Sequence, residues 1–154
     1  MSRSHWTFTA RMAATPYVVF DLISDLPNYG RWLPGSSAFG ATTEVSPYPV
    51  RLGSTYLDAG PSGRRPGSVT EYDRPTRIAF HQTMVAKKGP LTANTEVYIR
   101  YTFEPVEGAT FVTRDVDLRV RIAGLWQIAD PLVVAAFRKE NARLLPILKR
   151  YVEA

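Results

Sequence analysis

The last quarter of the chain, from Asp130 onward, has the spacing of an amphipathic α-helix, with apolar residues three and four positions apart. The apolar stripe comprises Val134, Phe137, Leu144, Leu145, Leu148 and Val152. Asp130 is expected to cap this helix, and Pro131 fits its first turn, where a missing N–H breaks no hydrogen bond. Pro146 lies inside the stripe and is expected to bend the helix, because proline removes a backbone hydrogen bond there.

Most of the preceding chain alternates between apolar and polar residues, as half-buried antiparallel strands do. Residues 5–12 form the first such strand, and its inward-facing residues are Trp6, Phe8, Ala10 and Met12. Further strands are predicted at 38–45, 52–59, 67–73, 77–86, 92–104 and 110–122, which makes about seven in all. Short helices are predicted at 16–25 and 28–35, and the Gly- and Pro-rich segment 60–67 is predicted to be a mobile loop.

The segment 92–122 is predicted to be a hairpin with a four-residue loop at 106–109. Counting outward from this loop pairs apolar residues with one another, as in Phe103 with Val112. The same count pairs opposite charges on the other face, as in Arg100 with Asp115. Both kinds of pair therefore support one register.

This register places a charged residue, Arg114, opposite Tyr101 on the apolar face of the hairpin. A charge on that face needs a partner or a path to water. Three interpretations stay open: Arg114 binds an anionic ligand group inside a cavity, its side chain reaches water at the rim of the sheet, or a bulge turns it outward. Glu71 is a candidate partner if the turn after it has four residues, whereas a five-residue turn puts Thr70 and Tyr72 on the inner face instead.

Composition limits the classes of function that fit the chain. It has 154 residues, a formal net charge of +5 and no cysteine, so we expect one domain over 1–154 and exclude disulfides and thiolate metal sites. The basic residues are scattered in pairs, so no nucleic-acid partner is expected. The N-terminal residues lack the apolar core of a signal peptide, and no segment approaches the roughly 20 apolar residues of a membrane span. A cytoplasmic protein without integral membrane association is therefore expected, and homodimerisation stays open.

The residue types that usually carry catalytic chemistry form no recognisable motif. Neither His5 nor His81 has a metal-ligand partner at suitable spacing, so no metal site and no cofactor are expected. Asp115 and Asp117 share a strand face with two arginines, which favours a solvated salt-bridge face over an acid–base pair. No phosphate-binding loop and no nucleophile elbow occurs in the sequence.

An ordered set of segments resembles the START-like superfamily. Residues 15–35, TPYVVFDLISDLPNYGRWLPG, are similar to the start of the family after its first strand, and residues 71–80, EYDRPTRIAF, resemble its Glu- and Pro-containing hairpin. Residues 107–120, EGATFVTRDVDLRV, are similar to one of its strands, and residues 138–153, RKENARLLPILKRYVE, resemble its closing helix. The superfamily includes birch-pollen-allergen-like proteins, polyketide cyclases/dehydratases and lipid-transfer domains. The departures are a single proline in the hairpin and Pro146 in the last helix.

The resemblance implies an α+β helix-grip fold, in which a curved antiparallel sheet of about seven strands surrounds the long C-terminal helix. It implies binding of a small hydrophobic molecule, such as a lipid, a polyketide or an aromatic metabolite, in a cavity between helix and sheet. Two alternatives stay open: a polyketide cyclase/dehydratase-type enzyme acting in that cavity, and a protein-interaction module with a closed core. A cavity above about 300 Å³ would argue against the closed core, and a buried group with a displaced pKa beside it would favour the enzyme.

The candidate ligand-binding residues are mostly aromatic or apolar, and the superfamily has no universal catalytic residue to assign. Three of them, Tyr101, Arg114 and Asn141, are expected to contact oxygen atoms of the ligand. The others are Trp6, Phe8, Trp32, Tyr56, Phe80, Met84, Trp126 and Phe137. The entrance is expected between segments 59–67 and 86–91 and the region of Trp32.

Overall fold

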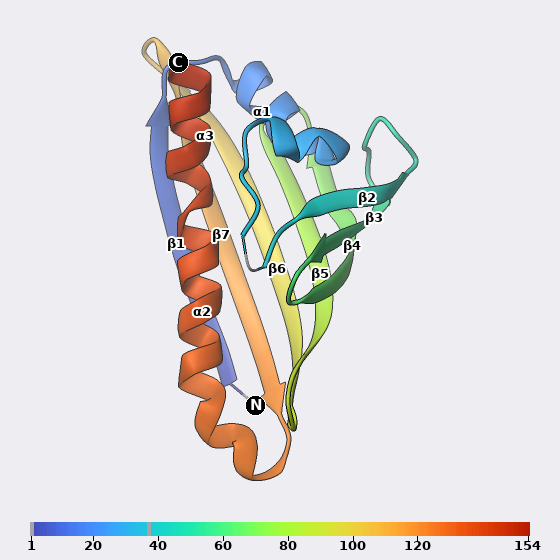
Figure 1. Ribbon diagram of the computed structural model, residues 1–154. Coiled ribbons are helices and arrows are strands. Elements are labelled where there is room, and N and C mark those ends of the chain that lie inside the picture. Colours follow the sequence, from blue (N-terminus) through green and yellow to red (C-terminus); the bar gives the residue numbers. More distant parts are fainter. Residues whose placement is uncertain (1, 37) are drawn as a thin grey trace.

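The computed structural model describes residues 2–36 and 38–154, and antiparallel strands in them form one seven-stranded sheet (Figure 1). The strands are β1 (Ser2–Met12), β2 (Ala41–Ser46), β3 (Thr55–Gly60), β4 (Gly63–Asp73), β5 (Arg77–Lys88), β6 (Leu91–Val106) and β7 (Ala109–Ile122). The helical elements are α1 (Pro16–Ser24), the 3₁₀ helices η1 (Leu26–Arg31) and η2 (Gly124–Ala129), α2 (Asp130–Ala142) and α3 (Leu144–Glu153). The predicted α+β fold is confirmed: a curved sheet, short helices after the first strand, and a helical segment at the C-terminal end.

The sheet has the order β1-β7-β6-β5-β4-β3-β2, so the first strand pairs with the last. α2 and α3 follow one another along β1 and β7, and α1 lies at the end of the sheet near the C-terminus (Figure 1). At that end α1 buries Phe20 and Ile23, and α3 buries Leu145 and Leu148. By contrast, Asn141 is the buried residue of α2. The core is therefore packed between α1, α3 and the sheet, while α2 borders a more open interior.

The predicted register of the β6–β7 hairpin is confirmed. Phe103 pairs with Val112, Arg100 pairs with Asp115, and Tyr101 pairs with Arg114. The connection is tighter than the predicted four-residue loop, because Val106 and Ala109 already form a pair. Gly108 has a positive φ of 68° in this turn, a conformation that glycine adopts without steric cost.

The β4–β5 hairpin decides the position of Glu71. Asp73 pairs with Arg77, and the register shifts between Val69 and Glu71. This bulge places Val69 and Tyr72, rather than Glu71, on the side of the core. Glu71 instead lies within 3.3 Å of Arg77 and 3.0 Å of Arg100. It is therefore not a partner of Arg114.

Two predictions about local structure are wrong. The segment 60–67 is not a mobile loop, because β4 begins at Gly63 and pairs directly with β3 from Gly60 onward. Asp130 is not the N-cap of α2, because η2 precedes it and its own backbone is helical. Its carboxylate accepts a hydrogen bond of 2.8 Å from the Ser2 hydroxyl.

The predicted effect of Pro146 appears as a break between α2 and α3. A proline cannot donate to the carbonyl four residues earlier, and its ring crowds that carbonyl. The carbonyl in question belongs to Ala142, which is the last residue of α2. Pro146 itself lies in the first turn of α3, where the missing N–H is tolerated. The apolar stripe nevertheless continues across the break.

Candidate functional site: a cavity between the helix and the sheet

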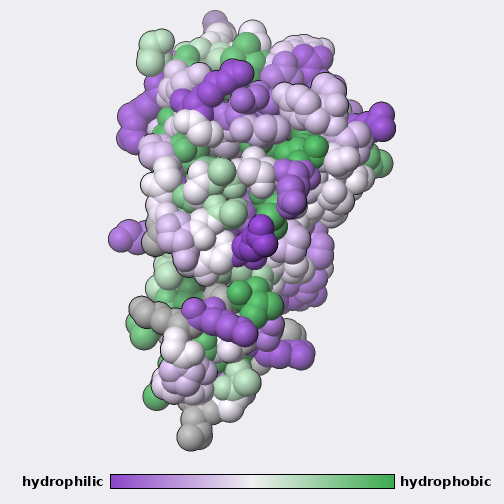
Figure 2. Space-filling model, turned by 45° about the vertical axis from the view of Figure 1, so that its right-hand side comes forward, coloured by the Kyte–Doolittle hydropathy of each residue, from purple (hydrophilic) through white to green (hydrophobic). Residues whose placement is uncertain are grey.

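A cavity of about 910 Å³ lies between α2 and the concave face of the sheet. Its apolar lining includes Leu26, Tyr29, Leu33, Phe39, Tyr56, Phe80, Met84, Val97, Ile99, Tyr101, Val133 and Phe137. Its polar and charged lining includes Ser36, Asp58, Ser62, Arg65, Gln82, Lys87, Arg114, Lys139, Glu140, Asn141 and Arg143. The face turned forward in Figure 2 shows hydrophobic patches separated by hydrophilic side chains. The cavity lining is therefore mostly apolar, with charged side chains from both the sheet and α2 set into it.

Arg114 is the charged group buried most deeply in this lining, with 2% of its surface exposed. Its Nε donates a hydrogen bond of 2.8 Å to the hydroxyl of Tyr101. Its Nη1 donates a longer bond of 3.3 Å to the backbone carbonyl of Asn141. Both partners are neutral, and no carboxylate oxygen in the described part of the chain lies within 4.0 Å of the guanidinium. The predicted inward position of Arg114 is therefore the observed one, and the rim and bulge interpretations do not apply.

A second polar group of the lining surrounds Asp58 on β3. Thr42 donates a hydrogen bond to one carboxylate oxygen, and Gln82 donates a bond of 3.0 Å to the other. The same Gln82 amide also donates to the hydroxyl of Tyr56 at 2.8 Å. Burial raises the pKa of the Asp58 carboxyl, while the bond from Thr42, the charge of Arg65 and the bond from Gln82 lower it by less. Asp58 is thus a half-buried acid with an elevated pKa in the lining of the cavity, the kind of group that can hold or donate a proton.

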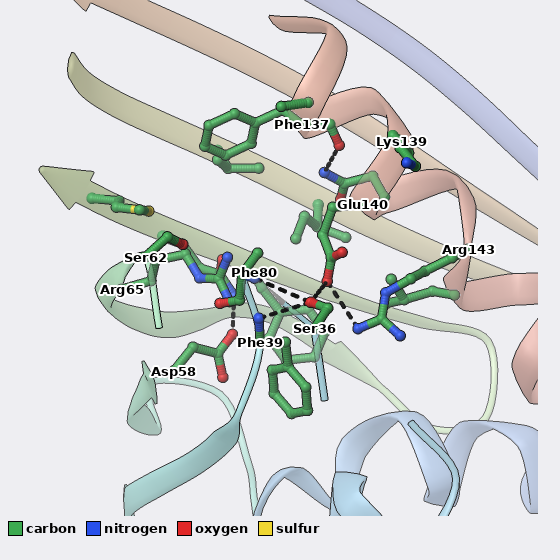
Figure 3. Close-up of a pocket in the computed structure, with 18 of the residues that line it drawn as sticks. Ser36, Phe39, Asp58, Ser62, Arg65, Phe80, Phe137, Lys139, Glu140 and Arg143 are labelled. Carbon is green, nitrogen blue, oxygen red and sulfur yellow. Dashed lines mark hydrogen bonds and ion pairs between the residues drawn. The ribbon is translucent and has the colours of Figure 1, made fainter. Parts of the chain in front are cut away.

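Glu140 of α2 joins the helix to the segment that crosses in front of the cavity. One of its oxygens accepts bonds of 2.9 Å from Ser36 and from Arg143, and Figure 3 shows Glu140 between these two side chains. The Ser36 hydroxyl also accepts hydrogen bonds from the backbone N–H groups of Ala38 and Phe39. This cluster ties the segment between η1 and β2 to α2, and it forms part of the rim.

Two tyrosines of the lining carry no charge at ordinary pH. Burial raises the pKa of Tyr29 well above its usual value, and Asp58 adds to this effect while Arg114 opposes it. Burial likewise raises the pKa of Tyr56, with a further contribution from Asp58. Both phenols are therefore neutral hydrogen-bonding groups. The Tyr29 hydroxyl already donates to the carbonyl of Ile23.

The structure brings most of the predicted site residues together and leaves others elsewhere. Those that line the cavity are Tyr56, Phe80, Met84, Tyr101, Arg114, Phe137 and Asn141. Trp6 and Phe8 pack against the core from β1, and Trp32 is buried beside Tyr29 with ring centroids 5.1 Å apart. Trp126 lies on η2 with 45% of its surface exposed. These four lie outside the lining, because an apolar residue in this fold can equally pack under the helices or face solvent.

The side-chain amide of Asn141 is hydrogen-bonded within its own helix. Its Nδ2 donates a hydrogen bond of 2.8 Å to the carbonyl of Phe137, one turn earlier in the helix. The backbone carbonyl of the same residue accepts from Arg114. Asn141 therefore positions Arg114 through its backbone, a role that its place on the apolar stripe did not reveal.

Sequence reasoning missed Asp58, Gln82, Arg65 and the Ser36–Glu140–Arg143 cluster. For two of these a signal existed, since residues two apart on a strand share a face. Asp58 follows Tyr56 at that spacing, and Gln82 lies between Phe80 and Met84. The three segments predicted to frame the entrance contribute to the lining: Ser62 from 59–67, Lys87 from 86–91 and Leu33 beside Trp32. Trp32 itself does not line the cavity, and the segment after Leu33 adds Ser36, Ala38 and Phe39.

The outer face of the sheet carries paired charges. His5 lies 3.0 Å from Asp117 and 3.6 Å from Asp115, and His81 lies 2.8 Å from Glu96. In the described residues no cluster of three or more His, Asp or Glu side chains is arranged to hold a metal ion. None of the helices described is long and apolar enough to cross a membrane.

Comparison with known proteins agrees with this architecture. The fold is shared with a START superfamily protein from Mycobacterium smegmatis, with a TM-score of 0.67, 18% identity and 97% of each chain covered. It is shared with Ara h 8.0201, with a TM-score of 0.67, 12% identity and 98% of each chain covered. Protein CV1439 from Chromobacterium violaceum has a TM-score of 0.62 and 15% identity, over 98% of this chain and 99% of that one. At these identities the likeness concerns the fold alone, and it confirms the helix-grip arrangement.

A search of curated proteins found no match. The family described as "Polyketide cyclase / dehydrase and lipid transport" matches residues 4–153. This match confirms the resemblance drawn from the sequence. Since it spans nearly the whole chain, the protein belongs to the polyketide cyclase / dehydrase and lipid transport family.

Proposed function

We propose that this protein binds a small hydrophobic molecule, such as a lipid, a polyketide or an aromatic metabolite, in the cavity between α2 and the sheet. The observation that carries the proposal is the cavity of about 910 Å³ with its mostly aromatic and aliphatic lining. Small-molecule sites usually have volumes of roughly 300–1,000 Å³ and combine apolar walls with a few polar groups. The volume and the lining both fit that description. They also argue against the third hypothesis, a module with a closed core.

The proposed contacts divide by chemistry. Tyr56, Phe80 and Phe137 offer aromatic surface to the apolar part of the ligand, and Met84 adds a side chain that adapts to its shape. Tyr101 and Arg114 offer the polar contacts, and the guanidinium is held at the carbonyl of Asn141 near the C-terminal end of α2. Trp6, Phe8, Trp32 and Trp126 are not proposed as contacts, since they lie outside the lining.

Two neighbouring alanines of α2 allow a matched test. Both side chains are exposed, but Ala136 lines the cavity and Ala135 does not. Ala136→Trp is expected to obstruct the cavity and weaken binding of a hydrophobic fluorescent probe at least tenfold, because the indole occupies ligand space. Ala135→Trp adds the same side chain to the same helix and should leave probe affinity unchanged. Equal affinity for both variants would refute binding in this cavity.

Native mass spectrometry of protein purified from its own host gives an independent measurement. A retained mass that Ala136→Trp lacks and Ala135→Trp keeps is the expected result. It would also identify the compound. A spectrum of the bare chain in the wild type would count against a tightly held natural ligand.

A second function, an enzyme of the polyketide cyclase/dehydrase type, is supported by Asp58. A carboxyl with a raised pKa beside an apolar cavity is suited to general acid–base chemistry. The test incubates wild type and Asp58→Asn with a poly-β-keto thioester and measures cyclised or dehydrated products by liquid chromatography and mass spectrometry. Product formed by the wild type and lost in the variant supports the enzyme. Equal product from both would remove Asp58 from the chemistry.

A further inference from the structure

We propose that the ligand of this cavity carries a carboxylate, and that the carboxylate binds the guanidinium of Arg114. The inference rests on the proposed binding function and specifies the chemical class of the ligand. The described part of the protein leaves the positive charge of Arg114 without a counter-charge. Arg114 has 2% of its surface exposed, yet its hydrogen-bond partners are the neutral Tyr101 hydroxyl and Asn141 carbonyl.

A guanidinium has five N–H donors in a fixed planar fork. Two of the five donors of Arg114 are used, one on Nε and one on Nη1. The other three have no protein acceptor among the described residues, and Arg114 lines the cavity. A buried cation without a counter-charge is costly, because the protein interior solvates it poorly. An anionic ligand group at this place would remove that cost.

The acids of the cavity are already engaged elsewhere. Asp58 accepts from Thr42 and Gln82, and Glu140 accepts from Ser36 and Arg143. Neither lies within 4.0 Å of Arg114 by the ion pairs of the described residues. Glu71, the partner considered from the sequence, lies with Arg77 and Arg100. The counter-charge for Arg114 therefore has to come from a molecule that enters the cavity.

The net charge of the whole lining also favours an anionic ligand. Its basic residues are Arg65, Lys87, Arg114, Lys139 and Arg143, and its acidic residues are Asp58 and Glu140. In addition, the Nε atoms of Arg65 and Arg143 are buried without a hydrogen-bond partner in the part of the chain described. An excess of cations in a low-dielectric pocket favours a negatively charged occupant over a neutral or positive one.

A carboxylate fits this site better than a phosphate. Arg114, the most buried cation of the lining, carries a single positive charge and balances one negative charge. A phosphate monoester carries roughly −1.5 to −2 at pH 7 and would bring excess charge into the buried site. A carboxylate carries a single charge, and its two oxygens match the fork of a guanidinium. The inferred ligand is therefore a hydrophobic carboxylic acid, bound with its acid group inward.

The test measures binding of three probes with the same alkyl chain, dodecanoate, dodecanol and dodecyl phosphate, by calorimetry below their micelle concentrations. Wild type is expected to bind dodecanoate about tenfold to a hundredfold more tightly than dodecanol, which is the usual range for hydrogen bonds to a charged group. Arg114→Met should abolish this preference while still binding dodecanol. Arg138→Met removes one positive charge from the exposed face of α2 outside the lining and should keep the preference.

Each outcome separates the two proposals. If none of the probes binds, the proposed binding function fails. If dodecanol binds as tightly as dodecanoate, the binding function stands and the carboxylate inference is overturned. Tighter binding of dodecyl phosphate would overturn the choice of carboxylate over phosphate.

A second measurement does not depend on the folding of the Arg114 variant. Dodecanoate labelled with ¹³C at the carboxyl group is titrated with acid while bound to the wild-type protein. Contact with the guanidinium should keep the bound carboxylate ionised at pH 7 although the cavity is apolar, because the opposite charge favours the ionised form. A bound carboxyl group that is protonated at pH 7 would rule out the contact.

Discussion

Gly67 of β4 pairs with Tyr56 of β3, and the tyrosine ring lies directly over it. A Cβ atom at position 67 would lie 2.4 Å from Cζ of Tyr56, 2.5 Å from its hydroxyl oxygen and 2.8 Å from Cε2. Tyr56 has 4% of its surface exposed and packs edge-on against Phe80 with ring centroids 5.9 Å apart. The substitution Gly67→Ala therefore forces a buried ring to move within a packed wall of the cavity.

The size of the effect follows from these distances. Carbon atoms pack best at about 3.5–4.0 Å, so the ring has to shift by roughly 1 Å. The shift also disturbs the 2.8 Å hydrogen bond from Gln82 to the Tyr56 hydroxyl. Overpacking of this kind costs about 1–3 kcal/mol of unfolding free energy. In a chain of this length each kcal/mol lowers the melting temperature by about 2–4 °C, which gives a decrease of about 2–12 °C.

Calorimetry of a control variant and of a double mutant tests whether the clash with the Tyr56 ring causes this loss of stability. Gly30→Ala is the control, since nothing lies within 4 Å of a Cβ at that position, and it should cost less than about 0.5 kcal/mol. Tyr56→Leu removes the ring, so Gly67→Ala should cost less in that background, and the double-mutant cycle should show a coupling of about 0.5–3 kcal/mol. If Gly67→Ala costs the same with and without the ring, the steric explanation is wrong.

Three further predictions concern the acid, the core and the rim. Burial raises the pKa of Asp58 in the folded state, so its stabilising effect is present at low pH and is lost as pH rises through the folded-state pKa. Urea unfolding between pH 4 and 7 should therefore show the stability of wild type falling relative to Asp58→Asn with rising pH, whereas a constant difference would contradict the raised pKa. Phe20→Ala removes a ring with 0% exposure. It should lower the free energy of unfolding, measured in urea, by about 3–5 kcal/mol. A loss below about 1 kcal/mol would show that this end of the core is not tightly packed. Ser36→Ala removes the acceptor of the Ala38 and Phe39 N–H groups, so hydrogen exchange at these amides should accelerate, and unchanged exchange would show that the serine does not hold the rim.

The β6–β7 hairpin shows how far the sequence alone can lead. Alternation with a period of two assigns each residue to a face, and a one-residue slip would expose every apolar side chain. Cross-strand pairs such as Arg100 with Asp115 then leave one register, which the structure has. That register was sufficient to place Arg114 on the inner face. All the pairs that fix this register lie within two neighbouring strands, β6 and β7.

The β4–β5 hairpin shows where such reasoning stops. Neither of the two loops considered for it includes a bulge, so neither puts Val69 and Tyr72 together on the inner face. A bulge changes the face of every residue beyond it, and alternation over a few residues does not reveal it. The same holds for residues 60–67, whose three glycines and two prolines are typical of a loop but which belong to the β3–β4 hairpin. Tertiary pairing overrides local propensity in both segments.

The sequence by itself determined the order of elements, the inward faces of most strands and the presence of a charge on an apolar face. Only the tertiary structure decided that the space beside this charge is hollow and that its neighbours are neutral. The physical reason is the distance along the chain between the groups concerned. Asp58 meets Gln82 across 24 residues, and Ser36 meets Glu140 across 104. Local patterns set which way a side chain points, but a cavity and a missing counter-charge depend on what all the other segments bring to the same place.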